Sequence, residues 1–272
     1  MKPNHNEIGV GATDDLSLRV SVATLVRVVF KHPSNGEWML ALERKATLHG
    51  TNVEVKSQPF GGAIRILDVD AIHDLIGDFH FDSERSRTEQ DFRLFVRPSS
   101  WSELREFCIE HLIIVDDPIL ETDPSRELTE EFADTLNINL KPEQYVSIPV
   151  ATVVENEAMP TDNFNARGVP TVRVYHIFEA TISDASLAHV MTTNSESNSD
   201  QVLRELASKD NQNGGKGRAN AILALPLKQI GEFYSVLSLQ ERNAPISFEN
   251  NRLDETVLAV FENIIVPKYQ RL

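Results

Sequence analysis

The chain has 272 residues, with 26 Lys and Arg against 41 Asp and Glu, and a formal net charge of -15. A surface this acidic repels a phosphodiester backbone, so binding to DNA or RNA regardless of sequence is not expected. Its one cysteine, Cys108, excludes an internal disulfide and a cysteine-based zinc site, and it favours a reducing, cytoplasmic compartment. No apolar run approaches the ~18 residues of a membrane helix. Residues 1–17 carry no signal-peptide pattern and are expected to form a flexible tail.

Strands and short helices are predicted in the first half of the chain. They are, in order, a strand at 19–30, a turn at 33–37, strands at 38–43 and 53–56, and helices at 70–75 and 102–112. Pro59-Phe60-Gly61-Gly62 is expected to form a tight turn, because glycine tolerates a positive φ. The charged stretch 82–93 is expected to be a solvated loop. Phe79, Phe81, Phe92 and Phe95 are expected to form a small satellite core.

The second half begins with an acidic helix. Its predicted elements are a helix at 126–136, strands at 145–154 and 171–181 joined through a turn at 167–170, a short helix at 201–207, a strand at 221–226, and helices at 227–237 and 253–266. The polar tracts 192–200 and 209–220 are expected to be loops. The elements together predict a mixed α+β fold.

The acidic helix carries the most informative pattern. Glu127, Glu130 and Glu131 have i, i+3, i+4 spacing, which places three carboxylates on one helix face. Like charges this close repel one another, and a hard divalent cation with oxygen ligands removes the repulsion. The alternative is an ordinary solvated acidic face, which is the commoner origin of such a charge run.

The same stretch resembles the signature of the Nudix hydrolase family. Arg126, Glu127, Leu128, Glu130 and Glu131 match the second half of the Nudix box in identity and spacing. The glycine pair after Phe60 resembles the first half. The resemblance implies an α+β fold built as an α/β/α sandwich, with a mixed sheet between helices.

Three departures from the Nudix pattern stand out. Asp68 stands where the family has Glu, and Ala133 stands where it has Gly, which predicts that the helix continues past that position. The two halves of the box are separated by an insertion of about 50 residues, approximately 69–120, which could refold the loop between glycine turn and helix or cap the pocket. Residues 18–272 are expected to form a single Nudix-like domain that contains this insertion.

The resemblance also implies an activity and a site. The activity is divalent-metal-dependent hydrolysis of a nucleoside diphosphate linked to another moiety, such as ADP-ribose or a related nucleotide, with Mg²⁺ or Mn²⁺ as cofactor. Glu130 and Glu131 would be metal ligands, Glu127 would be a further metal ligand or a base, and Arg126 would orient the three carboxylates. These four residues are the catalytic candidates. Gly61, Gly62 and Arg167 are substrate-binding candidates, with a plain turn charge as the alternative for Arg167.

Two other readings remain open. One is a Nudix-fold nucleotide sensor or regulatory module with little or no turnover, of the kind found in bacterial nucleotide-signalling defence. The other is an unrelated α+β protein with a chance acidic helix. A small nucleotide is the expected partner, a homodimer is possible, and membrane association is not expected. His176 is expected to be a satisfied core histidine, and the glycine-rich segment 214–218 a surface loop and not a phosphate cradle.

Overall fold

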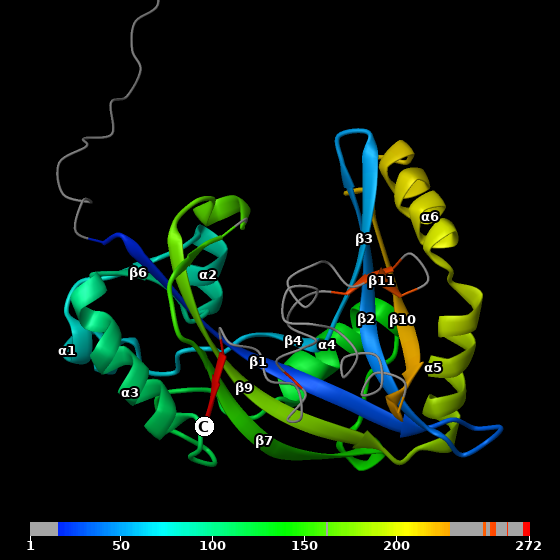
Figure 1. Cartoon of the computed structure of the whole chain (residues 1–272), viewed down its shortest axis with the longest axis horizontal. Helices are drawn as coiled ribbons and strands as arrows, with labels where there is room; N and C mark the ends of the chain where they lie inside the picture. Colours follow the sequence, from blue (N-terminus) through cyan, green and yellow to red (C-terminus); the bar gives the residue numbers. More distant parts are fainter. Residues whose placement is uncertain (1–15, 162, 229–246, 249–250, 254–259, 261–268) are drawn as a thin grey trace, which may run out of the picture.

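The computed structural model describes residues 16–161, 163–228, 247–248, 251–253, 260 and 269–272 (Figure 1). Within them, a mixed sheet has the order β11-β12-β3-β2-β1-β9-β7-β13 along its main path. The strands are β1 (Leu18–Lys31), β2 (Trp38–His49), β3 (Asn52–Gln58), β4 (Phe60–Ala63), β5 (His80–Phe81), β6 (Arg93–Val96), β7 (Tyr145–Glu155), β8 (Met159–Pro160), β9 (Pro170–Ile182), β10 (Arg218–Pro226), β11 (Ser247–Phe248), β12 (Asn251–Leu253) and β13 (Tyr269–Arg271). The helices are α1 (Val69–Ile76), α2 (Glu84–Glu89), α3 (Trp101–His111), α4 (Ser125–Leu136), α5 (Ala185–Ser197) and α6 (Asp200–Gln212), with 3-10 turns η1 (Pro98–Ser100), η2 (Pro142–Gln144) and η3 (Phe164–Ala166).

Strand β1 organises the sheet. Val20, Val22 and Val26 are fully buried on one of its faces, as expected for β-branched residues on a packed strand. One edge of β1 pairs in parallel with β9 from Arg19 to Val29. The other edge pairs successively with β6, β4 and β2. Strand β2 follows β1 directly in the chain, whereas β6 and β9 are distant in sequence and still meet along β1.

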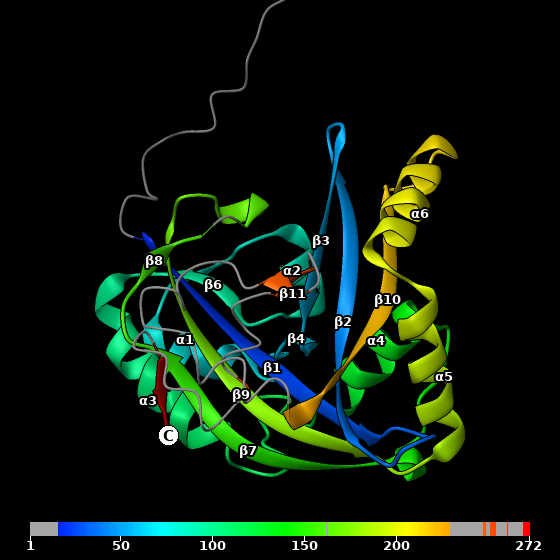
Figure 2. The same ribbon diagram turned by 45° about the vertical axis from the view of Figure 1, so that its right-hand side comes forward.

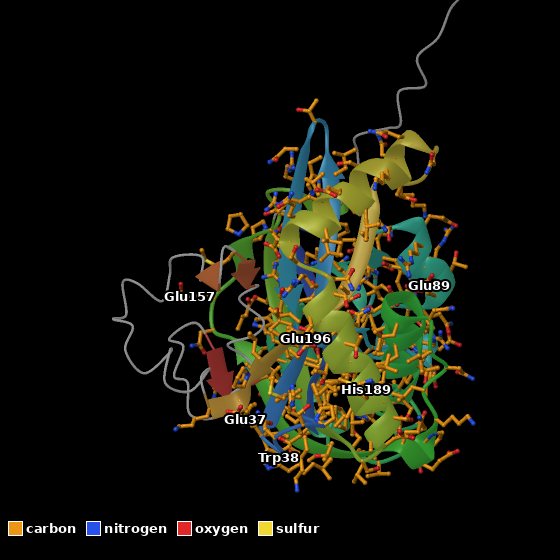
Figure 3. The ribbon with its side chains drawn as sticks, turned by 90° about the vertical axis from the view of Figure 1, so that its right-hand side faces the viewer. Glu37, Trp38, Glu89, Glu157, His189 and Glu196 are labelled. Atoms are coloured by element: carbon orange, nitrogen blue, oxygen red, sulfur yellow. The ribbon has the colours of Figure 1, made fainter. Side chains whose placement is uncertain are left out.

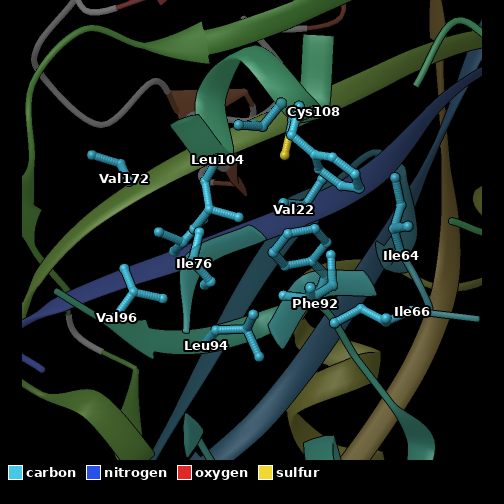
Figure 4. Packing of buried hydrophobic residues seen from close by; sticks show 14 of the residues in the cluster. Val22, Ile64, Ile66, Ile76, Phe92, Leu94, Val96, Leu104, Cys108 and Val172 are labelled. Carbon is cyan, nitrogen blue, oxygen red and sulfur yellow. The ribbon is translucent and has the colours of Figure 1, made fainter. Parts of the chain in front are cut away.

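The insertion packs against this sheet as a compact layer. Figures 1 and 2 show α1 and α3 together at one end of the molecule, beside the start of β1. Phe92 and Leu104 of the insertion pack with Val22 and Ile64 in a buried cluster (Figure 4). Phe79 belongs to the same cluster and Phe81 packs against it. The expected satellite core is therefore part of a larger core that the insertion shares with β1 and β9.

The insertion leaves and rejoins the chain at one place. Ile66 forms an antiparallel bridge with Leu120, and the Glu121 N–H donates to the Arg65 carbonyl at 3.0 Å. The two ends of the insertion are thereby held together at its base. About 50 additional residues are accommodated without separating β4 from helix α4, since closing a longer loop adds only slowly to its entropic cost.

Helix α4 packs against the same face of β1, farther along the strand. Leu128 and Phe132 are fully buried in a second cluster with Val26 and Phe60, and the Phe60 and Phe132 rings stack with centroids 5.0 Å apart. The helix continues past Ala133 to Leu136, as predicted.

Four predicted segments differ in the structure. Phe60–Ala63 is strand β4 and not a tight turn, because its backbone pairs with β1. The stretch 82–93 is not a solvated loop: it contains helix α2, whose N-terminus is capped by Ser83, and it buries Asp82 and Asp91.

Most of the tract 192–200 is likewise helical, as the end of α5, whose outer face exposes His189 and Glu196 (Figure 3). Its polar side chains have structural partners there. Asn194 Oδ1 accepts the Ile222 N–H at 2.8 Å and Ser195 Oγ accepts the Ala224 N–H at 2.9 Å, so they satisfy an edge of β10 that no strand covers in the described residues. The first residues of the predicted loop 209–220 similarly continue helix α6 to Gln212.

The two C-terminal helix predictions fall mainly outside the described residues. This applies to 227–237 beyond Lys228 and to 253–266 except for Leu253, which ends β12, and Val260. Among the residues that the structure describes, no helix has the length and apolar character needed to span a bilayer.

Candidate functional site

The glycine pair and helix α4 form the centre of the site. Gly61 has φ +134°, and a Cβ there would lie 3.0 Å from the Thr24 carbonyl carbon and closer still to its oxygen. At Gly62, a Cβ would lie 2.7 Å from Glu127 Cδ and closer to a carboxylate oxygen. Glycine at the first position therefore lets β4 approach β1, and glycine at the second lets the Glu127 carboxylate lie against the backbone.

Arg126 connects the acidic residues around this strand. Its guanidinium pairs with Glu121 at 2.6 Å, Glu127 at 2.7 Å and Glu130 at 3.5 Å, and it donates to the Ala63 carbonyl at 3.1 Å. One cation therefore faces three carboxylates. Burial raises the pKa of Glu127, with a further contribution from the Glu130 charge, while Arg126 opposes the shift.

Glu131 faces a second cation on strand β2. Lys45 Nζ lies 2.6 Å from Glu43 and 3.4 Å from Glu131. Burial, together with a hydrogen bond to Glu43 and the charge of Glu43, raises the pKa of Glu131 to about 9. Burial acts to lower the pKa of Lys45, but the two glutamates raise it overall. Glu43 is fully buried and also accepts hydrogen bonds from Thr135 and Gln58, each at 3.2 Å.

The three glutamates of helix α4 are suitable ligands for a hard cation, although each of them is paired with Arg126 or Lys45 in this structure. Glu127, Glu130 and Glu131 offer only carboxylate oxygens, the ligands that Mg²⁺ and Mn²⁺ prefer, and the Glu127 carboxylate lies against Gly62, in the space that a Cβ there would occupy. Within the described ranges, no group of three or more acidic, His or Cys side chains is drawn together as a ready metal site. A metal would therefore have to compete with Arg126 and Lys45 for these carboxylates.

Asp68, which stands where the Nudix pattern has a glutamate, caps a helix in this structure. Its side chain accepts the Ala71 N–H at 3.1 Å and caps the N-terminus of α1. The acidic residue in the displaced first half of the box therefore begins the insertion's first helix.

A polar pocket of 370 Å³ begins at the glycine strand, and Gly61 is one of its walls. Three arginines line it, one each from β1, β6 and β9: Arg19, Arg93 and Arg173. Ser21 of β1 pairs with Arg93 on one side and with Arg173 on the other. Arg93, Ser21 and Arg173 thus form a row across three adjacent strands. Arg19 lies two positions before Ser21 and therefore on the same face of β1.

Each guanidinium in this pocket is held by a carboxylate. Arg19 donates two bonds to Asp82, at 2.7 and 3.0 Å. Arg93 pairs with Asp91 at 2.9 Å and Arg173 pairs with Glu155 at 3.1 Å. None of these acids is among the residues that line the pocket. Burial lowers the pKa of Arg19, the Asp82 pairing opposes this, and the nearby Arg93 and Arg173 charges add to the lowering.

These arginines are not among the site residues predicted from the sequence. Arg19 and Arg173 occupy alternate positions of strands that were predicted, but Arg93 lies in the stretch expected to be solvated loop. The signal available in the sequence was a basic residue at the start of two otherwise apolar strands. Such a residue identifies a pocket only once the strand pairing is known.

Arg167 does not join this group. It lies exposed after η3, bridges in backbone register to Thr161, and is not among the residues lining the arginine pocket. The glycine-rich segment also lacks a free amide cradle, since Asp210 accepts the Gly217 and Arg218 N–H groups at 2.8 and 3.2 Å.

A family model described as SMODS-associated NUDIX domain matches residues 17–220. Neither the curated proteins nor the solved structures contain a match to the chain. The matched range includes both halves of the split box and the insertion between them. It confirms the Nudix resemblance of 126–131 and the mixed α+β Nudix-like fold, and it indicates a nucleotide-related hydrolase or a Nudix-fold module.

Proposed function

We propose that this chain, which belongs to the family of SMODS-associated NUDIX domains, is a divalent-metal-dependent hydrolase of a nucleoside diphosphate linked to another moiety, such as ADP-ribose or a related nucleotide. One observation carries the proposal. The arginine pocket and the acidic helix share the glycine strand, since Gly61 lines the pocket and Gly62 abuts Glu127.

The arginine pocket supplies a place for the phosphates. In a protein of net charge -15, three guanidiniums that line one pocket form a local site for an anion. A guanidinium has five N–H donors, so each arginine is able to keep its carboxylate partner and also donate to a phosphate oxygen. The carboxylates behind the arginines fix their direction, which reduces the ordering cost of binding.

The acidic helix supplies the groups for hydrolysis. Water attacks a phosphorus of the diphosphate, a P–O bond to the bridging oxygen breaks, and two phosphorylated products leave. Arg126 holds Glu127 beside the glycine strand. Glu127, whose pKa is raised by burial, is the candidate for accepting the proton of the attacking water. Glu131, with a pKa of about 9, already carries a proton near neutral pH in the metal-free chain.

Glu127, Glu130 and Glu131 would hold the metal. When bound, Mg²⁺ or Mn²⁺ neutralises diphosphate charge and lowers the pKa of a coordinated water. Because Glu131 takes up a proton readily in the metal-free chain, metal binding near neutral pH should release protons.

The test is product formation from ADP-ribose, NAD, diadenosine polyphosphates and nucleoside triphosphates, with Mg²⁺ or Mn²⁺ and after chelation. We expect a nucleoside monophosphate or diphosphate product that disappears with EDTA. Glu127→Gln and Glu131→Gln should each reduce the rate by at least about 100-fold, and Arg93→Gln should mainly raise KM. Glu89→Gln, on exposed helix α2, is the matched control and should leave the rate unchanged.

A binding module without turnover is the second candidate. The observation that favours it is that Arg126 pairs with Glu127 and Glu130 and Lys45 pairs with Glu131, so that a metal would have to displace both cations. It predicts that a nucleotide raises the Tm without yielding product, and that Arg93→Gln abolishes this shift. Absence of product from every substrate under both metals would reject the hydrolase and leave this alternative.

A further inference from the structure

A second cavity lies between the end of the insertion and strands β7 and β9. It measures 550 Å³ and is lined mainly by aliphatic side chains, including Leu112, Ile114 and Val150, together with the Phe178 ring. Its size lies within the range of small-molecule sites. No residue that lines it also lines the arginine pocket, so the two are separate.

Three polar side-chain atoms at this cavity are buried and have no hydrogen-bond partner among the residues that the structure describes. They are Ser147 Oγ, Thr152 Oγ1 and His176 Nδ1, and their residues all line the cavity. Thr152 and His176 are each 4% exposed and face each other in the β7–β9 register. His176 is thus buried but not satisfied, which corrects the expectation from sequence. Buried polar groups left unpaired are costly, and three at one cavity point to a ligand that pairs with them.

The charges around the cavity exclude an anion. Asp116 and Asp123 line it, and no Lys or Arg is among the described residues that do. Burial lowers the pKa of His176 to about 4, so its ring is neutral near pH 7 and supplies no positive charge. A phosphate would therefore be repelled here, whereas the arginine pocket attracts one.

The polar atoms and rings also limit the ligand's shape. Each hydroxyl group is able to donate and to accept a hydrogen bond. A neutral imidazole donates from one ring nitrogen and accepts at the other. The His176 and Phe178 rings, tilted by 56° with centroids 4.3 Å apart, both line the cavity, so that an aromatic ligand would meet aromatic side chains there. We propose that this cavity binds a neutral, flat heteroaromatic molecule that both donates and accepts hydrogen bonds, such as a purine base or its nucleoside.

Adenosine is the first probe, tested by calorimetry on the full chain in EDTA, so that no hydrolysis contributes. AMP is the second probe. Comparing it with adenosine tells whether the cavity binds a free nucleoside or the base of a nucleotide. We expect saturable adenosine binding that Thr152→Val weakens by about fivefold, the cost of one hydrogen bond. This substitution preserves volume and strand preference. Arg93→Gln should weaken AMP binding and leave adenosine binding unchanged.

Two further measurements locate the binding. Adenosine should shift the His176 ring ¹⁵N signals and leave those of exposed His189 in place. Val146→Thr, an exposed position on the same strand, is the matched control and should bind normally. The proposal is overturned if neither adenosine nor adenine binds at millimolar concentration, or if binding is insensitive to Thr152→Val and His176→Phe but lost in Arg93→Gln. Neither result depends on the hydrolase being active.

Discussion

Gly62 and Glu127, which belong to the two separated halves of the box, lie in contact because only a hydrogen atom occupies the side-chain position of Gly62. The bridge between Ile66 and Leu120 at the base of the insertion makes this contact possible. Strand β4 and helix α4 are therefore in direct contact, although the insertion separates them in the sequence.

Substitution at the two glycines should have different consequences. Gly62→Ala displaces the Glu127 carboxylate, a movable group, so the chain should fold and lose about 100-fold in hydrolysis rate. Gly61→Ala meets the backbone of Thr24 at a positive φ and should cost about 2 kcal/mol or more in stability. Urea unfolding and the product assay measure the two effects.

Gly36→Ala is the control for the glycine variants, because it has φ +73° but open space around it. It should cost only about 1 kcal/mol and leave the rate intact. Full activity in Gly62→Ala would contradict the role of the Gly62–Glu127 contact.

Lys45 should stabilise the chain through Glu43. Lys45→Met leaves the fully buried Glu43 carboxylate without its cation, which should cost about 3 kcal/mol in the free energy of unfolding without metal. Lys45→Met combined with Glu43→Gln should recover much of that loss, since no buried charge then remains unpaired. Lys56→Met, which removes the exposed Glu54 pair, should cost less than about 1 kcal/mol. Equal losses in the two lysine variants would argue against this interpretation.

The buried pair between Arg19 and Asp82 should be equally important for the arginine pocket. Asp82→Asn should destabilise the chain by about 3–5 kcal/mol, because both side chains are almost fully buried. Glu89→Gln breaks the exposed pair with Arg85 and should change stability by less than about 0.5 kcal/mol. Chemical denaturation of both variants checks the difference, which would vanish if solvent reached Arg19 freely.

His176 should make the fold sensitive to acid. Its pKa is about 4 when folded, against an ordinary histidine value of 6.5, so the unfolded chain binds the proton more readily between these values. The stabilisation from a neutral His176 is complete above pH 6.5 and is lost as the pH falls toward 4, amounting to about 2 kcal/mol between pH 7 and pH 5. Urea unfolding of the parent and of His176→Gln at both pH values measures it. A parent and variant with the same pH dependence would contradict the prediction.

Much of the fold followed from local patterns. The strands at 19–30, 145–154 and 171–181 and the helix at 126–136 were predicted within one or two residues, because hydrophobic periodicity and turn residues act locally. The prediction failed for some polar segments, which were expected to be loops but whose side chains form hydrogen bonds or ion pairs with distant parts of the fold. Asn194 and Ser195 look like loop residues but serve strand β10, and Asp82 looks solvated but holds a buried arginine.

The sequence by itself determined the acidic helix and its i, i+3, i+4 carboxylates, because helical spacing depends only on chain geometry. The family resemblance also followed from those residues. Only the tertiary structure decided that the glycine pair meets this helix, and that arginines on β1, β6 and β9 line one pocket. These arrangements depend on strand pairing between segments more than 60 residues apart in the case of β1 and β6. Such pairing reflects which surfaces bury one another, and no local pattern along the chain specifies it.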